Sequence, residues 1–571
     1  MSLPQTLLIP FPEFMLSTPT IQDCNQILDL ECENSQFSCN SHKKIVPLQP
    51  NIINKTSVTS KNKYGQYFTI GLIADFMVSL ITHNKCSRIL EPSCGKGIFL
   101  KYLQEHGYHN LMAYEIDKTL KSEYDFIRYQ SFLSIPIEEK YDVIIGNPPY
   151  IRWKNIEPEL KVELENNSLW NKYFNSLCDY LFIFILKSIE HLEKNGELIF
   201  ICTEYWMNTT HSATLRNYMC ENGYFTEIYH FKETPLFEKV TASFVIFKFV
   251  KSDVKKESIT LYKYNKIKGL PSQEELCERT CFDIEEIPHF KKNSRWILAS
   301  ESIQKELVTF EKACTNQNTT TKELYRIGDL CEIGNGMVSG LDAAFQIKET
   351  NTLNPDEQKC IINVLKAKDL MSYKNVSKTH YIFIQEDLSE IEFASKYPHF
   401  ARHFSPYKEK LSERYSYNRD IPFWEFVFPR NQKLFERNVP RIFVPCKERI
   451  SNKEYFRFCY ASSEYFPTQD VTAIFKKQHC KESIEYILAY LNNKRVFNWL
   501  TLNGIVKGAI VEFSETPIAS IPFRPIDWRN TKEVNIHNLI TEEVKQYLED
   551  TNPSHIMTIN NHFNTLFHEQ D

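Results

Sequence analysis

Short apolar runs alternate with helix-compatible stretches from Tyr64 onward. Four runs have the length of buried strands: "SRILEP" (87–92), "LMAYEID" (111–117), "YDVIIGN" (141–147) and "GELIFICTE" (196–204). Residues 97–106 and 179–193, which lie between them, suit helices. This alternation predicts an α/β fold with a doubly wound, largely parallel sheet, whose ligands bind at the carboxyl ends of the strands.

Two further apolar runs, "FTEIYHF" and "SFVIFKFV", come next in the sequence. No long helix follows the second run. This spacing predicts an edge hairpin that closes the sheet near Val250, so we expect the first domain to span residues 61–265.

The rest of the chain divides by pattern into four parts. Residues 1–60 are rich in Asn, Ser and Thr and have no sustained period, which indicates an extension on the main body. Residues 266–320 are irregular and mixed in charge, as is typical of a linker or bridging region. A second apolar pattern over 321–525 predicts a separate α+β domain, and the tail over 526–571 is predicted to be helical and polar.

Composition narrows the class of protein. A chain of 571 residues, 42% hydrophobic and 24% charged, suits two or three globular domains. It has no run of 18 apolar residues and no basic region at its start, so we expect a soluble cytoplasmic protein without a membrane segment. The scattered cysteines are expected to be reduced thiols, and no metal site is predicted, because Cys277 and Cys281 lack a second pair.

The segment "ILEPSCGKGIFL" (89–100) combines a carboxylate with a glycine turn at a strand end. Gly95 and Gly97 let the backbone approach a ligand, and Glu115 follows about twenty residues later, where nucleoside-binding folds place a ribose-binding acid. The segment lacks the third glycine of a dinucleotide motif, which favours a nucleoside ligand without a pyrophosphate. A plain strand-to-helix connection is the alternative.

The segment "NPPY" (147–150) is the more specific signal. Asn147 offers a side-chain carbonyl, and Pro148 offers a backbone carbonyl that proline geometry holds rigidly. Together they can accept both hydrogens of a planar amino group and make its nitrogen a better nucleophile, while Tyr150 stacks on the base that carries it. A proline-stiffened turn after a strand is the alternative.

The order "GQYFT", "EPSCGKGIF", "AYEID" and "GNPPY" resembles the TaqI-type, gamma-class DNA adenine-N6 methyltransferases of bacterial restriction-modification systems. The resemblance runs from about Lys61 to Phe523. It implies a Rossmann-like catalytic domain over 61–265 with a mostly parallel seven-stranded sheet, followed by a target-recognition domain over 321–525. It also implies S-adenosylmethionine as cofactor, double-stranded DNA as substrate, a separate cognate restriction endonuclease, and a monomer in a bacterial or archaeal cytoplasm.

The resemblance also assigns roles to individual residues. The residues expected at the cofactor are Thr69, Glu91, Ser93, Gly95, Gly97, Glu115, Ile116, Ser131, Phe132 and Pro149. Among them Glu91 would lie near the methionine end, Glu115 on the ribose hydroxyls and Ile116 against the adenine ring. The residues expected to act on the target base are Asn147, Pro148 and Tyr150, with Phe237 as a second stacking ring.

Two of these assignments carry a qualification. The family usually has Asp-Phe where this chain has Ser131-Phe132, so the polar contact to the cofactor adenine would come from Ser131, Gln130 or backbone. Phe237 could instead be a core aromatic before an edge strand.

A basic and aromatic stretch follows in the second domain. Residues 402–457 hold 13 Lys or Arg against 7 Asp or Glu, a balance of +6, with 12 aromatic residues among them. Such a stretch can position phosphates and read base edges, although it can also be an ordinary solvated face. The net charge of −5 does not itself suggest nucleic acid. Segments such as "YFPTQDVTAIF" resemble the target-recognition domain of the family and favour DNA.

The sequence therefore predicts transfer of a methyl group from S-adenosylmethionine to N6 of a flipped adenine in a DNA site. Other amino groups stay open as substrates: N4 of cytosine, an RNA base or a protein glutamine. A catalytically inactive DNA-binding relative is a further alternative. A fused nuclease domain is not expected, because about sixty residues before the methyltransferase pattern are too few.

Overall fold

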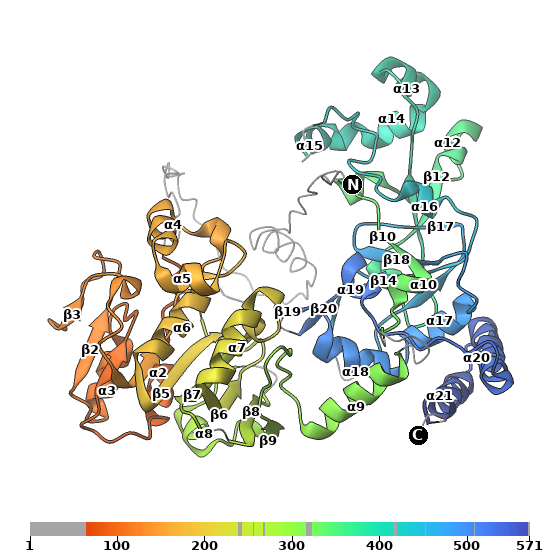
Figure 1. Ribbon diagram of the computed structural model, residues 1–571. Coiled ribbons are helices and arrows are strands. Elements are labelled where there is room, and N and C mark those ends of the chain that lie inside the picture. Colours follow the sequence, from red (N-terminus) through yellow and green to blue (C-terminus); the bar gives the residue numbers. More distant parts are fainter. Residues whose placement is uncertain are drawn as a thin grey trace, which may run out of the picture. The chain divides into compact units, whose positions relative to one another are not determined.

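In the computed structural model, one mixed β-sheet of nine strands organises the chain between residues 89 and 288 (Figure 1). The residues that the structure describes are 64–237, 242–254, 256–266, 269–315, 323–414, 419–450, 453–507 and 509–568. The extension predicted for residues 1–60 lies outside the described residues.

The strand order across this sheet is β3-β2-β1-β4-β5-β7-β6-β8-β9. The strands are β1 (Ile89–Glu91), β2 (Leu111–Tyr114), β3 (Ile127–Arg128), β4 (Tyr141–Gly146), β5 (Leu192–Thr203), β6 (Gly223–His230), β7 (Phe244–Lys251), β8 (Ser258–Tyr264) and β9 (Phe282–Pro288). Pairing is parallel from β3 to β5 and between β6 and β8, whereas β7 and β9 run antiparallel to their neighbours. The predicted α/β class and mostly parallel sheet are confirmed.

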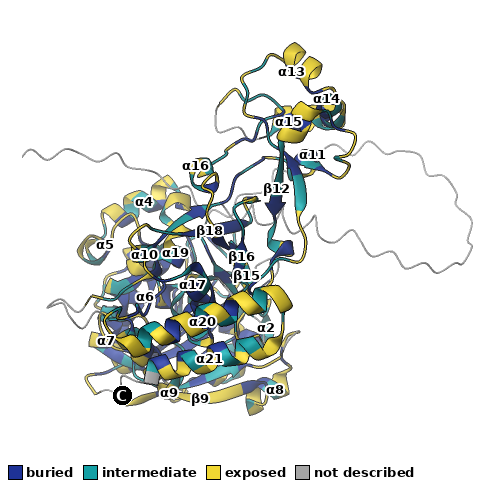
Figure 2. Cartoon of the chain, turned by 90° about the vertical axis from the view of Figure 1, so that its right-hand side faces the viewer, coloured by how far each residue is buried: buried dark blue, intermediate teal, exposed yellow. Residues whose placement is uncertain are grey.

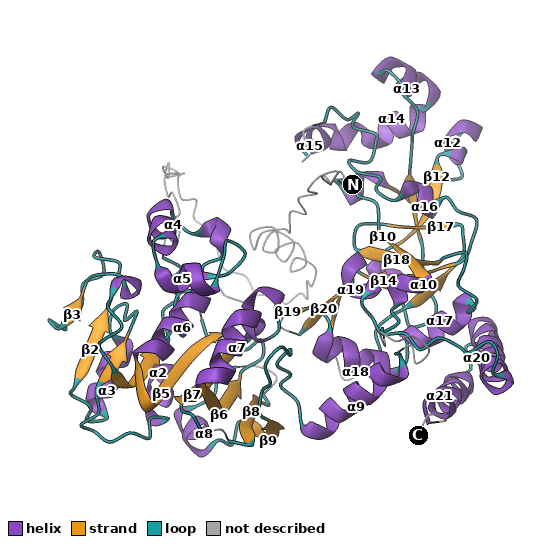
Figure 3. Cartoon of the chain, in the orientation of Figure 1, coloured by secondary structure: helices purple, strands orange, loops and turns teal. Residues whose placement is uncertain are grey.

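Helices cover both faces of the sheet because its central strands are apolar on both sides (Figure 3). In β4, Val143 and Ile145 pack in one buried cluster and Ile144 packs in another, and all three are fully buried. The helices that share the cluster of Val143 are α2 (Gly71–Ser79), α3 (Ile98–Glu105) and α8 (Gln273–Glu278). The helices that share the cluster of Ile144 are α4 (Pro158–Glu165), α5 (Ser168–Tyr173), α6 (Tyr180–His191) and α7 (Ala213–Asn222).

The predicted edge of the sheet was wrong, and so was its count of seven strands. The apolar strand β7 lies between β5 and β6 instead of closing the sheet near Val250. The boundary predicted at residue 265 falls between β8 and β9, which pair with each other. The strand β9, "FDIEEIP", escaped notice because an edge strand exposes much of its surface and its charged residues hide the strand pattern. The strand β3 has only two residues and leaves no pattern.

Three smaller sheets and many short helices follow β9. Their strand orders are β10-β18-β14-β16, β11-β13-β12-β17 and β15-β20-β19. The strands are β10 (Cys331–Asn335), β11 (Gln346–Ile347), β12 (Ile361–Leu365), β13 (Thr379–Ile382), β14 (Arg441–Pro445), β15 (Lys447–Arg449), β16 (Cys459–Ala461), β17 (Tyr465–Pro467), β18 (Val471–Lys476), β19 (Val506–Lys507) and β20 (Ile510–Glu512). The helices up to residue 519 are α9 (Glu301–Ala313), α10 (Ile327–Leu330), α11 (Asp342–Phe345), α12 (Pro355–Lys359), α13 (Glu390–Lys396), α14 (Pro398–Phe404), α15 (Lys408–Glu413), α16 (Gln432–Phe435), α17 (Ile484–Leu491), α18 (Lys494–Asn503) and α19 (Glu515–Ala519).

Two helices follow residue 525. They are α20 (Thr531–Asp550) and α21 (Pro553–His568), which pack against each other and keep their outer faces exposed (Figure 2). Ile540 and Phe563 are fully buried in the same apolar cluster as α17. Within the described part of the chain, no helix is both long and apolar enough to cross a membrane.

A buried ion pair joins two neighbouring strands of the large sheet. The Lys248 ammonium lies 2.9 Å from Glu197 Oε1, and both side chains are only 4% exposed. Lys248 also donates to the carbonyl oxygen of Leu80, and the backbone amide of Thr82 donates to Glu197 Oε2 at 3.1 Å. The pair thus ties β5 and β7 to the turn after α2.

Lys248→Met should lower the free energy of unfolding by about 3–5 kcal/mol, because it leaves the Glu197 carboxylate buried without its counter-charge. The double variant with Glu197→Leu should recover most of that loss. Urea denaturation followed by circular dichroism measures both. Lys194→Met is the matched control, because the Lys194–Asp253 pair is exposed and its loss should have no measurable effect. A single variant as stable as the wild type would contradict the expectation.

Candidate active site

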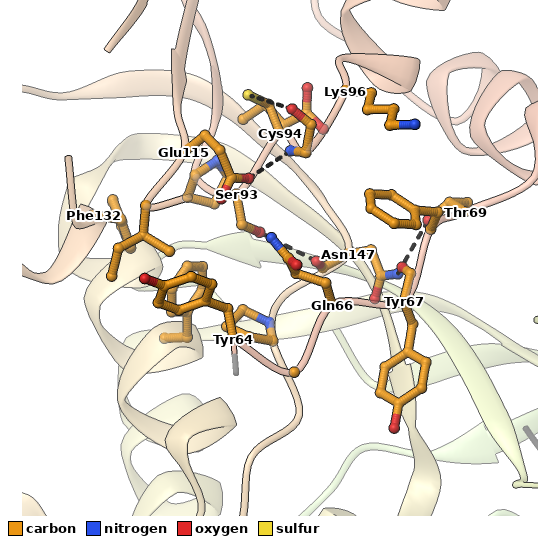
Figure 4. A pocket seen from close by; sticks show the side chains of 18 of the residues that line it. Tyr64, Gln66, Tyr67, Thr69, Ser93, Cys94, Lys96, Glu115, Phe132 and Asn147 are labelled. Atoms are coloured by element: carbon orange, nitrogen blue, oxygen red, sulfur yellow. Dashed lines mark hydrogen bonds between the residues drawn. The ribbon is translucent and has the colours of Figure 1, made fainter. Parts of the chain in front are cut away.

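A cavity of about 380 Å³ opens beside the carboxyl ends of β1, β2 and β4 (Figure 4). Its lining includes ten of the residues that the sequence singled out: Thr69, Glu91, Ser93, Gly95, Glu115, Ile116, Ser131, Phe132, Asn147 and Pro149. The others, Gly97, Pro148, Tyr150 and Phe237, are outside this lining. The parallel strands bring these residues together because each strand ends at the same edge of the sheet.

The glycine turn after β1 shapes one wall of the cavity. Gly97 precedes α3 as its N-cap with φ of +87°, and a Cβ there would lie 2.8 Å from the Tyr124 ring. Its role is therefore conformational. The backbone amide of Gly95 donates to Glu115 Oε2 at 2.8 Å, so the turn and the carboxylate hold each other in place.

Two buried carboxylates stand at the ends of neighbouring strands, and they differ in their hydrogen bonds. Glu115 accepts from the backbone amides of Gly95 and Asp117, each at 2.8 Å. Burial raises the pKa of Glu115, and these two amides oppose the rise. Glu91 is 1% exposed, and its Oε2 has no hydrogen-bond partner among the residues that the structure describes. Burial, together with the Glu115 charge, raises the pKa of Glu91 well above its ordinary value.

Part of the cavity lining is apolar. Phe132 is 2% exposed, and its ring lies 5.0 Å from that of Phe184 between centroids. Ile116 and Leu160 also line the cavity. Buried carboxylates and apolar side chains in one cavity suit a ligand with a cationic group and a planar ring.

A buried lysine holds the loop that carries Phe132. The Lys187 ammonium donates to the carbonyl oxygens of Leu133 and Ile135, and burial lowers the pKa of Lys187 to about 8. The sequence did not single out this lysine, because a charged residue inside the apolar helix "CDYLFIFILKSIEHL" gives no sign of its partners. Its position in an otherwise apolar helix was the available signal.

Ser131 serves as a local cap. Its Oγ accepts from the backbone amide of Leu133 at 3.2 Å and begins the short 3-10 helix η1 (Phe132–Ser134). Asp and Ser are both good capping residues, so either fits the backbone here. A carboxylate from another element, Glu163 on α4, lies near Ser131. Its negative charge acts to raise the pKa of both Tyr180 and Lys187. Its Oε1 is buried without a hydrogen bond to any described residue.

The amide of Asn147 is fixed in one orientation. Its Nδ2 donates to the carbonyl oxygen of Tyr67 at 2.7 Å and to Thr69 Oγ1 at 3.1 Å, and Ser93 Oγ donates to its backbone oxygen at 3.2 Å. Because the carbonyl oxygen of Tyr67 can only accept, the Nδ2 end of the amide faces it and the Oδ1 atom faces the other way. That oxygen accepts from the Tyr150 hydroxyl, which also lies 2.7 Å from the carbonyl oxygen of Ile201.

Aromatic rings gather beside this amide. The Tyr150 and Tyr67 rings are 6.0 Å apart and inclined by 28°, and Tyr67 is 6.5 Å from Phe237. Phe237 is 3% exposed and packs on Phe244 at 4.7 Å, as a core aromatic would. Its stacking role therefore stays a prediction. Tyr67 was missed as a site residue, although it lies in the quoted segment "GQYFT".

The basic stretch of the second region is largely committed to contacts within the protein. At least eight of its thirteen cationic side chains bond to protein groups: Lys408, Arg414, Arg419, Arg430, Arg437, Arg441, Arg449 and Arg457. Arg441 is fully buried, and burial lowers its pKa to about 10. The balance of +6 therefore overstates the charge that this stretch can offer to a ligand.

The fold has a known counterpart among solved structures. The type IIL restriction-modification enzyme MmeI, solved in complex with DNA, matches with a TM-score of 0.52 at 13% sequence identity. The match covers 84% of this chain and 69% of that one. At this identity the likeness concerns the fold alone.

Sequence relatives identify the family. Residues 74–237 match the family model of the Eco57I restriction-modification methylase. The type II methyltransferase M.HindII of Haemophilus influenzae is 44% identical over 517 residues, which cover 88% of this chain and 97% of that protein. M.HincII, also of Haemophilus influenzae, is 42% identical over 511 residues, with the same coverage of 88% and 97%. The resemblance found in the sequence is thus confirmed, and the chain belongs to the type II methyltransferases of restriction-modification systems.

Proposed function

We propose that this methyltransferase transfers a methyl group from S-adenosylmethionine to N6 of an adenine flipped out of a specific double-stranded DNA site. The fixed orientation of the Asn147 amide is the observation that carries the proposal, since its donor end is held by Tyr67 and Thr69 and its carbonyl oxygen is left on the side of the Tyr150 hydroxyl. We further propose that the protein acts as a monomer and that its modification protects DNA from a separate cognate endonuclease.

The cavity suits S-adenosylmethionine. The Oε2 of Glu91, which bonds to no described residue, matches the ammonium group of the methionine part, because a buried carboxylate oxygen without a hydrogen bond favours a cation. Glu115 has lone pairs left for the ribose hydroxyls, and Ile116 with Phe132 provides apolar surface for the adenine ring. When bound, this cofactor supplies a methyl group on a positively charged sulfur, which is open to attack by a nucleophile.

Asn147 and Pro148 would prepare the nucleophile. The exocyclic nitrogen of adenine is a poor nucleophile because its lone pair is delocalised into the ring. Two carbonyl oxygens that accept its N–H bonds favour a more tetrahedral nitrogen with an available lone pair. Asn147 Oδ1 has two lone pairs, so it can accept from the base while it still accepts from Tyr150. Burial raises the pKa of Tyr150 well above its ordinary value, which keeps this hydroxyl a donor.

Other substrates remain as alternatives. The same two carbonyls could orient N4 of cytosine, an RNA base or a glutamine amide. The relatives are type II restriction-modification methyltransferases, which supports DNA. Adenine is preferred to cytosine because enzymes that act on N4 of cytosine usually have Ser where this chain has Asn147. An inactive DNA-binding relative is disfavoured by the intact Asn147 and by the Glu91 Oε2 atom, which bonds to no described residue.

Expression of the protein in a host that lacks this modification should introduce N6-methyladenine confined to one sequence motif, which single-molecule sequencing detects. Asn147→Ala should lower methylation at least about a hundredfold, because one of the two orienting acceptors is lost. Asn155→Ala, an exposed position after the same loop, is the matched control and should methylate normally. No modified base in wild-type DNA would contradict the proposal, and N4-methylcytosine would contradict the choice of base.

Binding of S-adenosylhomocysteine should strengthen as pH rises toward the raised pKa of Glu91. Burial and Glu115 favour the neutral carboxyl in the free protein, whereas the ammonium of the ligand favours the carboxylate, so binding below that pKa releases a proton. Isothermal titration calorimetry in buffers of different ionisation enthalpy measures both quantities. Glu91→Gln should bind S-adenosylhomocysteine more weakly and without pH dependence. Glu105→Gln, on the exposed side of α3, is the matched control and should bind as the wild type does. Wild-type binding without proton release at any pH below neutrality would count against the assignment.

Ser131→Asp should tighten binding of S-adenosylhomocysteine by about tenfold, because a carboxylate that accepts from the adenine amino group forms a stronger hydrogen bond than a hydroxyl. The new side chain can keep the cap on Leu133. Ser134→Asp, exposed on the same turn, serves as the control. If titration calorimetry gives equal or weaker binding for Ser131→Asp, the adenine ring does not lie at this end of the cavity.

A further inference from the structure

Tyr67 lies against both rings that were predicted to hold the flipped base. Its ring is 6.0 Å from that of Tyr150 and inclined to it by only 28°, which is a stacked arrangement. On the Phe237 side it makes an edge contact at 6.5 Å and 67°. A planar group that stacked on this face of Tyr150 would need the space that the Tyr67 ring fills.

The three rings differ in how firmly they are held. The Tyr150 hydroxyl is bonded to Asn147 and Ile201, and Phe237 is 3% exposed and packed on Phe244. Tyr67 is 36% exposed, and its hydroxyl makes no hydrogen bond to another residue that the structure describes. The ring of Tyr67 can therefore turn toward solvent, whereas the other two cannot move without breaking buried contacts.

The backbone of Tyr67 is fixed even though its ring is not. Its carbonyl oxygen accepts from Asn147 Nδ2 at 2.7 Å. Two residues earlier, Gly65 has φ of +62°, and a Cβ there would lie 2.5 Å from Ile151 Cγ1 and 3.1 Å from the Tyr150 carbonyl oxygen. This close packing leaves side-chain rotation as the movement that Tyr67 can make. Figure 4 shows the ring directed away from Glu115 and Phe132, on the far side of the Asn147 amide.

The geometry points to Tyr67 as an aromatic placeholder, a ring that fills the base-binding slot until the flipped adenine displaces it. Without this ring the face of Tyr150 would be exposed to water whenever no base is bound. When the base enters, Tyr150 loses its stacking contact with Tyr67 and gains one with the base. This inference rests on the proposed function and adds a residue that controls how readily the base enters.

The test uses a DNA duplex that carries the methylated motif, with 2-aminopurine in place of the target adenine, and the full-length protein with S-adenosylhomocysteine. The 2-aminopurine fluorescence reports base flipping, and its titration gives the affinity. Tyr67→Ala should bind this duplex about threefold to tenfold more tightly than the wild type, because no ring has to leave the slot. Tyr67→Phe keeps the ring and should match the wild type.

If the alanine variant does not fold, Tyr67→Leu tests the same expectation, and it should also bind the duplex more tightly than the wild type. Weaker binding by either variant would show that Tyr67 is a permanent wall of the slot and would overturn the inference. Equal binding would show that the ring does not stand in the path of the base and would overturn the inference as well. A wild-type protein that leaves 2-aminopurine stacked contradicts the proposed function itself, so the two failures are distinguishable.

Discussion

The hydrogen bonds that hold the Asn147 amide are the interaction on which the site depends. An amide has a donor end and an acceptor end of nearly the same shape, and only its neighbours decide which end faces a ligand. Here the carbonyl oxygen of Tyr67 and the hydroxyl of Thr69 bind the donor end. Two prolines after Asn147 then limit the freedom of the chain, so the acceptor end keeps one direction. The orientation is built before any substrate arrives.

Two carboxylates at the ends of neighbouring strands differ in their hydrogen bonds within the protein. Glu115 satisfies the backbone amides of the glycine turn, and those amides in turn stabilise its charge. Glu91, equally buried and one strand away, receives no such bond on Oε2 from any residue that the structure describes. One carboxylate is therefore part of the protein's own framework, and the other keeps an oxygen that the proposed cofactor can use, although both look alike in the sequence.

The sequence allowed prediction of the central sheet because its buried parallel strands are unbroken apolar runs. It did not reveal β9, whose exposed charges hide the strand pattern, or β3, which is too short to have one. Most of the predicted site residues line one cavity, since strand order alone brings their positions together. Tyr67 and Lys187 were missed because their roles depend on partners distant in sequence. For the same reason a count of charges could not show that Arg441 is enclosed by carbonyl oxygens.

The segment from Tyr64 to Thr69 lines the cavity at the strand ends and also holds the Asn147 amide. The backbone of this segment is fixed, so the parts that a ligand can still order are side chains such as those of Tyr67 and Thr69. A ligand that orders these side chains from one side leaves less disorder for a second ligand to remove, and thermodynamic linkage requires the advantage to be equal in both directions. Under the proposed function, these side chains would couple the binding of cofactor and base without any change in the sheet beneath them.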